Sequence, residues 1–89
     1  MTMKNLPNKK DWELAARSLL KGAMANHGID YAELSRRMQA MEIENANTHN
    51  LRTKINRGSF SGAFLLQALI AIGVEELNIK KLPISKQFY

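Results

Sequence analysis

The feature that most constrains the fold is an almost unbroken apolar segment, residues 63–72, in a chain of only 89 residues. Its length and spacing indicate a helix, with Ser59 or Ser61 available as the N-cap and Gly73 placed to end it. A helix that is apolar on nearly every side must be covered by other elements. We therefore expect this segment to be the buried helix of a single compact domain.

Two amphipathic helices are expected in the first half of the chain. The first should run from Asp11 to His27, because apolar residues recur there at three- and four-residue steps and Gly28 follows. The second should begin after Asp30, an N-cap with Glu33 in the capping-box position, and end between residues 40 and 43. The residues expected to face the core are Trp12, Ala15, Ala16, Leu19, Leu20, Ala23, Met24, Tyr31, Leu34, Met38 and Met41.

A third helix should follow a polar turn. Residues 44–48 are rich in side chains that bond to their own backbone, which favours turns and caps over helix interiors. The helix itself should span residues 48–57, with only Leu51 and Ile55 turned inward and Gly58 as its left-handed stop. The predicted fold is therefore all-α, a compact domain of four to five helices with an elongated turn before the third.

The two ends of the chain differ from this helical domain, which we expect over residues 11–76. Residues 1–10 are polar and basic and show no periodicity, which is typical of a flexible arm. Residues 77–89 mix apolar alternation with Pro83, so this tail is a short turn of helix, an edge strand or a docked arm. Its apolar residues have no other evident use, which also makes it a candidate dimerisation segment.

The charge of the chain is positive and segregated. The formal net charge is +5, and all eight acidic residues lie outside residues 1–10, 45–74 and 80–89. A basic balance in so small a protein favours an anionic partner, either nucleic acid or an acidic surface.

Other function classes lack their chemistry in this sequence. The absence of cysteine excludes disulfides, thiol nucleophiles and cysteine-ligated zinc, and no histidine spacing suits a metal. The segment 58–62 looks superficially like a nucleophile elbow, but Phe60 occupies the nucleophile position. No apolar run approaches the ~20 residues of a membrane span. We expect a cytoplasmic protein that is not an enzyme, without metal, cofactor or small-molecule substrate.

The exposed face of the expected helix 48–57 carries the main functional signal. With Leu51 and Ile55 inward, the other side chains present amide, hydroxyl, imidazole and guanidinium groups and no carboxylate. Such a face can pair with base edges and phosphates without repelling a nucleic-acid backbone. The candidates for base contact are His49, Asn50, Arg52, Thr53 and Asn56, and those for phosphate contact are Arg36, Arg37, Lys54, Arg57, Ser59 and Ser61.

Simpler roles are open for several of these residues. Arg36 and Arg37 are also placed to form a solvated helix face that pairs with Glu33. Asn47 and the two serines suit helix caps, and cations near a helix C-terminus complement its dipole. The basic arm, with Lys4, Lys9 and Lys10, either enters a minor groove or is a disordered terminus.

The order of these elements resembles the lambda-repressor-like, or Xre/Cro-like, helix-turn-helix family. The resemblance covers most of residues 17–74 and rests on the segments 28–35, 55–58 and 64–74. It extends to small bacterial domains of no assigned function that share sequence segments like those from Trp12 to Met24 and from Arg57 to Gly73. One departure is that the interval from Glu33 to Gly58 is several residues longer than the usual motif, so the turn carries an insertion.

The resemblance implies a homodimer that binds double-stranded DNA with sequence specificity, usually as a transcriptional repressor, with helix 48–57 in the major groove. Two alternatives stay open. One is a helical protein-interaction module, such as an accessory factor of a phage or mobile element, that uses the apolar helix or the tail. The other is non-specific nucleic-acid binding through the two basic ends of the chain.

Overall fold

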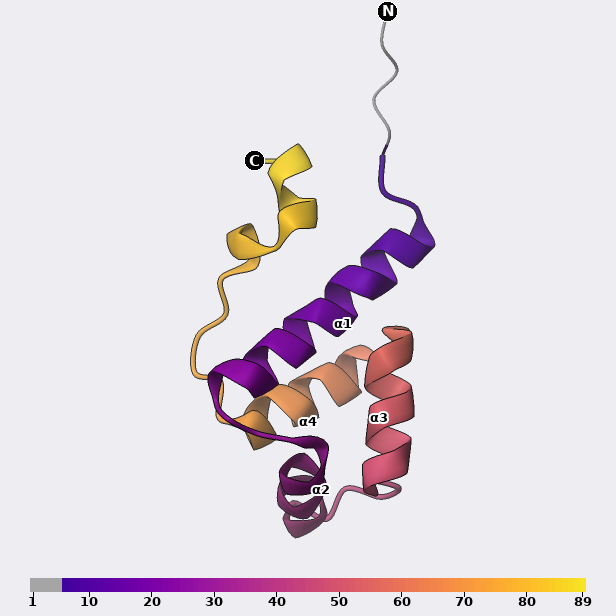
Figure 1. Ribbon diagram of the computed structural model, residues 1–89, viewed down its shortest axis with the longest axis vertical. Helices are drawn as coiled ribbons and strands as arrows, with labels where there is room; N and C mark the ends of the chain where they lie inside the picture. Colours follow the sequence, from indigo (N-terminus) through magenta and orange to yellow (C-terminus); the bar gives the residue numbers. More distant parts are fainter. Residues whose placement is uncertain (1–5) are drawn as a thin grey trace, which may run out of the picture.

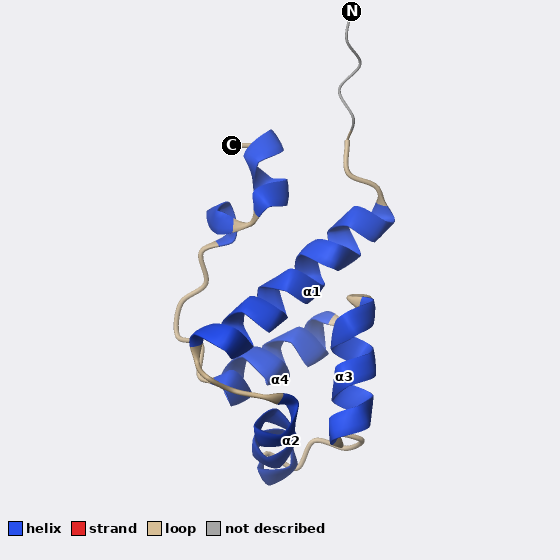
Figure 2. Ribbon diagram, viewed as in Figure 1, coloured by secondary structure: helices blue, strands red, loops and turns tan. Residues whose placement is uncertain are grey.

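The computed structural model describes residues 6–89, and throughout this range the regular structure is helical (Figure 1; Figure 2). The all-α prediction is confirmed. Four α-helices form the body of the molecule, and two short 3-10 turns follow in the tail. The elements are α1 (Lys9–Asn26), α2 (Tyr31–Ala40), α3 (Thr48–Arg57), α4 (Gly62–Ile72), η1 (Ile79–Lys81) and η2 (Pro83–Gln87).

Helix α1 begins two residues before the expected start, because Asn8 is its N-cap. The Asn8 side chain accepts a hydrogen bond from the Asp11 amide (2.9 Å), and the Asp11 carboxylate accepts one from the Asn8 amide (3.0 Å). This reciprocal capping box satisfies two donors that the helix cannot pair itself. Lys9 and Lys10 therefore belong to the helix rather than to the predicted arm, while Lys4 lies outside the described residues.

The other three helices start at the caps that the sequence offers. Asp30 accepts from the Glu33 amide (2.8 Å) at the start of α2, which confirms the predicted N-cap. Asn47 caps α3 in the same way, and this helix has the predicted bounds. Of the two serines weighed for α4, Ser61 is the cap, with its hydroxyl accepting from the Phe64 amide.

The segment between α2 and α3, where the sequence predicts an elongated turn, is an anchored linker of residues 41–47. Glu42 and Asn45 adopt left-handed φ values of 60° and 59°, so the chain turns sharply twice. Between α2 and α3 the carbonyl of the buried residue Ala46 accepts hydrogen bonds from the Ser35 hydroxyl (2.6 Å) and from the side-chain amide of Gln39 (3.2 Å). The linker is thus fixed to α2, and it sets where α3 begins.

All four α-helices contribute to one hydrophobic core. Helix α3 contacts both α1 and α2, and α4 also packs against α1 and α2 (Figure 1). Gly58, which ends α3 at φ 70°, lies directly against the backbone of Glu13 in α1. The largest fully buried side chains are Leu20, Leu34, Met38, Leu51, Ile55 and Ile72.

Helix α4 has more buried residues than α1, α2 or α3, as predicted, but one of its sides is exposed. Leu66 and Ile70, one turn apart, are 62% and 66% exposed, because α1 and α2 cover only the opposite side of the helix. Two residues assigned to the core are also exposed. Met41 falls at the C-cap of α2 instead of inside it, and Trp12 lies beyond the four-helix core, near the start of α1.

The tail is a docked arm with two 3-10 turns, and the edge-strand alternative is therefore wrong. It leaves the end of α4 and returns along α1, where η2 packs (Figure 1). Ser85 is buried there, with its hydroxyl donating to the carbonyls of Lys80 (3.0 Å) and Leu82 (2.7 Å). The ring of Phe88 stacks on Trp12 with 5.8 Å between centroids, which explains the position of Trp12.

Candidate nucleic-acid interface

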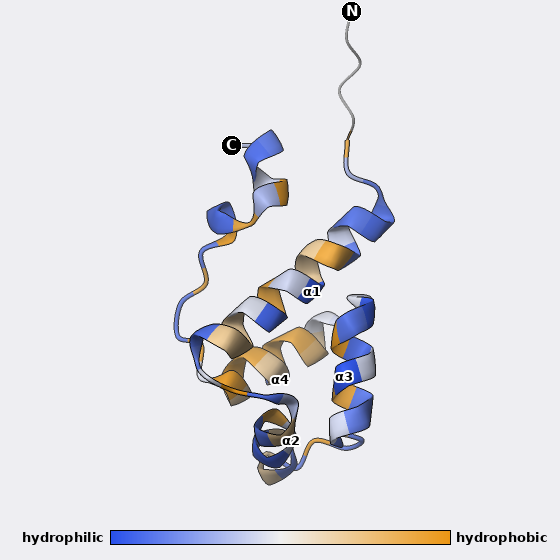
Figure 3. Ribbon diagram, viewed as in Figure 1, coloured by the Kyte–Doolittle hydropathy of each residue, from blue (hydrophilic) through white to orange (hydrophobic). Residues whose placement is uncertain are grey.

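Helix α3 is attached to the core by a narrow apolar face. Leu51 and Ile55 are 2% and 0% exposed, as the sequence predicted, and they pack where α1 and α2 meet α3. The remainder of the helix is strongly hydrophilic (Figure 3). A ten-residue helix held by two buried side chains leaves most of its circumference to solvent.

One flank of α3 opens into a surface hollow. His49, Thr53 and Arg57 follow one another at one-turn intervals along it. No side-chain hydrogen bond or ion pair within residues 6–89 engages these three residues, so their polar groups are available to a ligand. The complete lining is Asn45, His49, Asn50, Thr53, Lys54, Arg57, Ser59, Phe60 and Ser61, which contains no acidic residue.

The opposite flank of α3 carries the other two base-contact candidates. The Arg52 guanidinium lies over the Tyr31 ring of α2, 5.3 Å from its centroid. Asn56 faces α1, and its Oδ1 accepts a hydrogen bond from the Lys21 ammonium (3.4 Å). The structure therefore divides the five base-contact candidates between two flanks instead of bringing them together.

Lys21 is a site residue that the sequence reasoning missed. The sequence shows only that Lys21 lies one turn beyond Arg17 and outside the apolar stripe of α1, which does not mark it as a site residue. Nothing in the sequence relates this turn of α1 to Asn56, which lies 35 residues further along the chain. The crossing of α1 and α3 makes the connection, and it adds a cation to this flank.

Some candidates are engaged within the protein. The Asn50 amide donates to the Asn45 carbonyl (3.2 Å), so this side chain closes the linker. Lys54 lies over the Phe64 ring, 4.9 Å from its centroid, at the edge of the hollow. Ser61 is occupied as a cap, whereas Ser59 is exposed.

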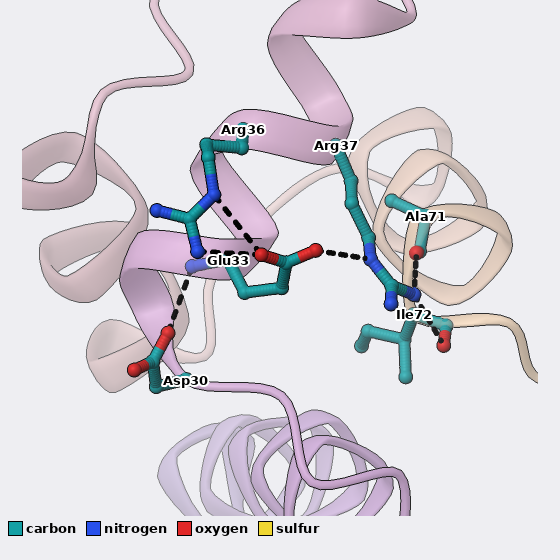
Figure 4. Close-up of polar contacts among 6 residues, drawn as sticks. All are labelled: Asp30, Glu33, Arg36, Arg37, Ala71 and Ile72. Atoms are coloured by element: carbon teal, nitrogen blue, oxygen red, sulfur yellow. Dashed lines mark hydrogen bonds and ion pairs between the residues drawn. The ribbon is translucent and has the colours of Figure 1, made fainter.

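The two arginines of α2 form an ion-pair cluster with Glu33 (Figure 4). Arg36 and Arg37 both donate to the Glu33 carboxylate, the latter at 2.9 Å, which confirms the pairing weighed for this helix face. The hydrogen bonds from Arg37, and next from Arg36, hold the pKa of Glu33 below its usual value. Arg37 also donates to the carbonyls of Ala71 (3.1 Å) and Ile72 (3.4 Å) at the end of α4. Arg37 therefore joins two helices, and Arg36 is the more exposed of the pair.

Two further observations concern other kinds of site. Among residues 6–89 the structure gathers no group of three or more His, Asp or Glu side chains that could hold a metal ion. In the same range, no helix combines the length and the apolar character that crossing a membrane requires.

The fold and this surface define a small all-α domain whose exposed helix α3 is polar and cationic. The chain belongs to the family described as Domain of unknown function (DUF6471), whose model matches residues 12–77. The match includes α2, α3, α4 and nearly all of α1, and it stops in the loop before η1. No curated protein and no solved structure matches the sequence. The family agrees with the expected likeness to small domains of no assigned function, and the lambda-repressor-like relation stays a prediction.

Proposed function

We propose that this protein binds double-stranded DNA with sequence specificity, inserts α3 into the major groove and acts as a regulator of transcription. The observation that carries the proposal is the exposed surface of α3. It presents His49, Thr53 and Arg57, which have no side-chain hydrogen bond or ion pair among residues 6–89, in one hollow, inside an acid-free segment of thirty residues, 45–74.

The chemistry of the two flanks suits this placement. The major groove is about 12 Å wide and admits one α-helix, with a phosphate backbone on either side. Arg57 and Lys54 lie on one flank of α3, and Arg52 and Lys21 lie on the other. Cations on both flanks can contact both strands and so fix the register of the helix. His49 and Thr53 then offer an imidazole and a hydroxyl to base edges.

The arrangement of α2 and α3 supports a helix-turn-helix relation. The two helices cross, and α2 lies at one end of α3 (Figure 1). The longer linker is compatible with this function because its Ala46 carbonyl is bonded to α2, which makes the connection rigid. The exposed Arg36 at the surface of α2 is a further candidate for phosphate contact, whereas Arg37 is committed to Glu33 and α4.

The test is selection of binding sequences from a random duplex pool, followed by affinity measurements at several salt concentrations. The diagnostic variant is Arg52→Ala/Arg57→Ala, and Lys80→Ala/Lys81→Ala is its charge-matched control in the tail. We expect the wild-type protein and the control to select one motif. The diagnostic variant should bind that motif more weakly and reduce the slope of log affinity against log salt by about 2, one unit for each lost phosphate contact.

Two results would contradict the proposal. The absence of any enriched motif would remove sequence-specific recognition. Equal losses in the two variants would instead favour non-specific binding through the basic ends of the chain. A further variant, Thr53→Ala, changes no charge, and we expect it to alter the preferred bases while leaving the salt dependence unchanged.

The second candidate function is a protein-interaction module, and the exposed apolar residues of α4 favour it. A module of this kind would retain its activity in the Thr53→Ala variant and lose it when Leu66 is made polar. The two functions are compatible if the protein partner is another copy of the DNA-binding chain.

A further inference from the structure

Helix α4 presents an uncovered apolar stripe. Leu66 and Ile70 are about two-thirds exposed, and Gly62 and Ala63 lie on the same side of the helix. An added Cβ at Gly62 would meet no atom beyond its own helix backbone within 4 Å among residues 6–89, so no described element covers this side. The helix contains no charged residue at all, which is unusual for a face in contact with water.

The two ends of this stripe carry opposite charges. Arg57 lies beside the N-terminal end of α4, where it shares a hollow with the Ser61 cap. Glu75 and Glu76 are exposed just beyond the C-terminal end. Arg37 of α2 also lies at the C-terminal end of α4, but this arginine is already paired with Glu33. The stripe is thus basic at its start, apolar in its middle and acidic at its finish.

We propose that this stripe is the interface of a homodimer in which two α4 helices pack antiparallel across a two-fold axis. In a two-fold interface the same patch must complement itself. Antiparallel pairing places Leu66 and Ile70 of one copy on Leu66 and Ile70 of the other. It also brings Arg57 of each copy to Glu75 and Glu76 of its partner, which is the charge complementarity that a self-association surface requires.

The structure favours this surface over the tail, the earlier candidate for dimerisation. The tail packs on α1 of its own chain through Ser85 and Phe88, so part of its apolar character is used internally. The α4 stripe has no such use. The small residues Gly62 and Ala63 let two helix backbones approach closely, which increases the contact between them.

The first test measures self-association of the full chain by sedimentation equilibrium without DNA. We expect a monomer-dimer equilibrium whose dissociation constant rises at least about tenfold in Leu66→Ser/Ile70→Ser, because two apolar side chains per copy are no longer buried. The matched control is Leu14→Ser/Met41→Ser, since Leu14 and Met41 are exposed apolar residues away from the stripe. The control should dimerise like the wild-type protein. Because all four residues are at least 40% exposed, circular dichroism should show folded variants.

The second test distinguishes the antiparallel arrangement from other contacts through α4. Arg57→Glu alone and Glu75→Lys/Glu76→Lys alone each place like charges against one another at both ends of the dimer. Each variant should therefore associate roughly threefold to tenfold more weakly than the wild-type protein. Mixed together, the two variants should form a heterodimer at wild-type strength, because both ends are again complementary.

A monomeric wild-type chain at all concentrations, or equal weakening by the two serine variants, would overturn the dimer. Charge variants that fail to rescue each other would overturn its antiparallel geometry. These outcomes are independent of the proposed function, because no DNA is present in either experiment.

Discussion

Gly58 offers a sharp test of how α3 is held against α1. Its φ of 70° is unfavourable for any residue with a side chain, and a Cβ at this position would collide with the Glu13 carbonyl oxygen. Contacts below 3.0 Å are essentially never found for real Cβ atoms, so α3 and α1 would have to move apart. The substitution Gly58→Ala therefore combines backbone strain with a collision between two helices.

The chain provides a matched control in Gly28. This glycine also has a left-handed φ, 65°, but an added Cβ there would meet nothing within 4 Å in the part of the chain that the structure describes. Gly28→Ala should cost about 1 to 2 kcal/mol from backbone strain alone. Gly58→Ala should cost about 1 to 3 kcal/mol more, because overpacking displaces the backbone. The larger total approaches the roughly 3 to 5 kcal/mol that a domain of this size has available.

The assay is thermal unfolding of both variants followed by circular dichroism. A loss of 1 kcal/mol lowers the Tm of such a domain by about 4 to 8 °C. We expect a moderate decrease for Gly28→Ala, and at least twice that decrease or no cooperative unfolding for Gly58→Ala. Equal decreases in Tm would refute the reasoning, because they would show that the approach of α1 to Gly58 imposes no constraint.

Three further predictions concern buried hydroxyls, pH and the tail. Ser35→Ala removes a hydrogen-bonded hydroxyl and should lower the free energy of unfolding by about 1 kcal/mol, measured with denaturant. Tyr31→Phe removes a buried hydroxyl that has no hydrogen-bond partner among the described residues, so it should leave the stability unchanged or increase it. Equal losses of stability in the two variants would contradict this difference between a bonded and an unbonded hydroxyl. Because the pKa of Glu33 is lowered in the folded state, its contribution to stability is present at neutral pH and lost as the pH falls below about 4, so Glu33→Gln should destabilise the protein at pH 7 and match the wild type at low pH. Phe88→Ala should change the fluorescence of Trp12, the single tryptophan, and expose it to quenchers, while an unchanged spectrum would mean that the tail does not dock.

The helices could be predicted because their signals are local. The start of α2 and the end of α3 depend on the side chains of Asp30 and Gly58, which act within one turn of themselves. The start of α1 differs from the prediction for a reason of the same kind, since the Asn8–Asp11 capping box begins the helix two residues before the start that the apolar periodicity predicts. Capping interactions join residues that are close in the sequence, so a single sequence contains the information needed to place them.

The exposure of α4 could not be predicted, because it depends on how many neighbours a helix has. The spacing of Leu66 and Ile70 is that of a buried helix, and only the shortage of covering elements leaves them in solvent. The candidate site shows the same limit. The cationic face of α3 follows from its sequence. That Arg52 and Asn56 lie on a different flank of α3 from Thr53 depends on contacts with other helices, namely with Tyr31 of α2 and Lys21 of α1.

The contacts that orient α3 are separate from the groups that it presents. Its orientation is set by the approach of Gly58 to α1 and by the hydrogen bonds that anchor the Ala46 carbonyl to α2. His49 and Thr53 take part in no side-chain hydrogen bond or ion pair within the described residues. Substitutions at these two positions should therefore change unfolding free energy by no more than about 0.5 kcal/mol. A change in ligand preference at His49 or Thr53 with unchanged stability would then report on the surface of α3 itself, whereas a change at Gly58 would report on its placement.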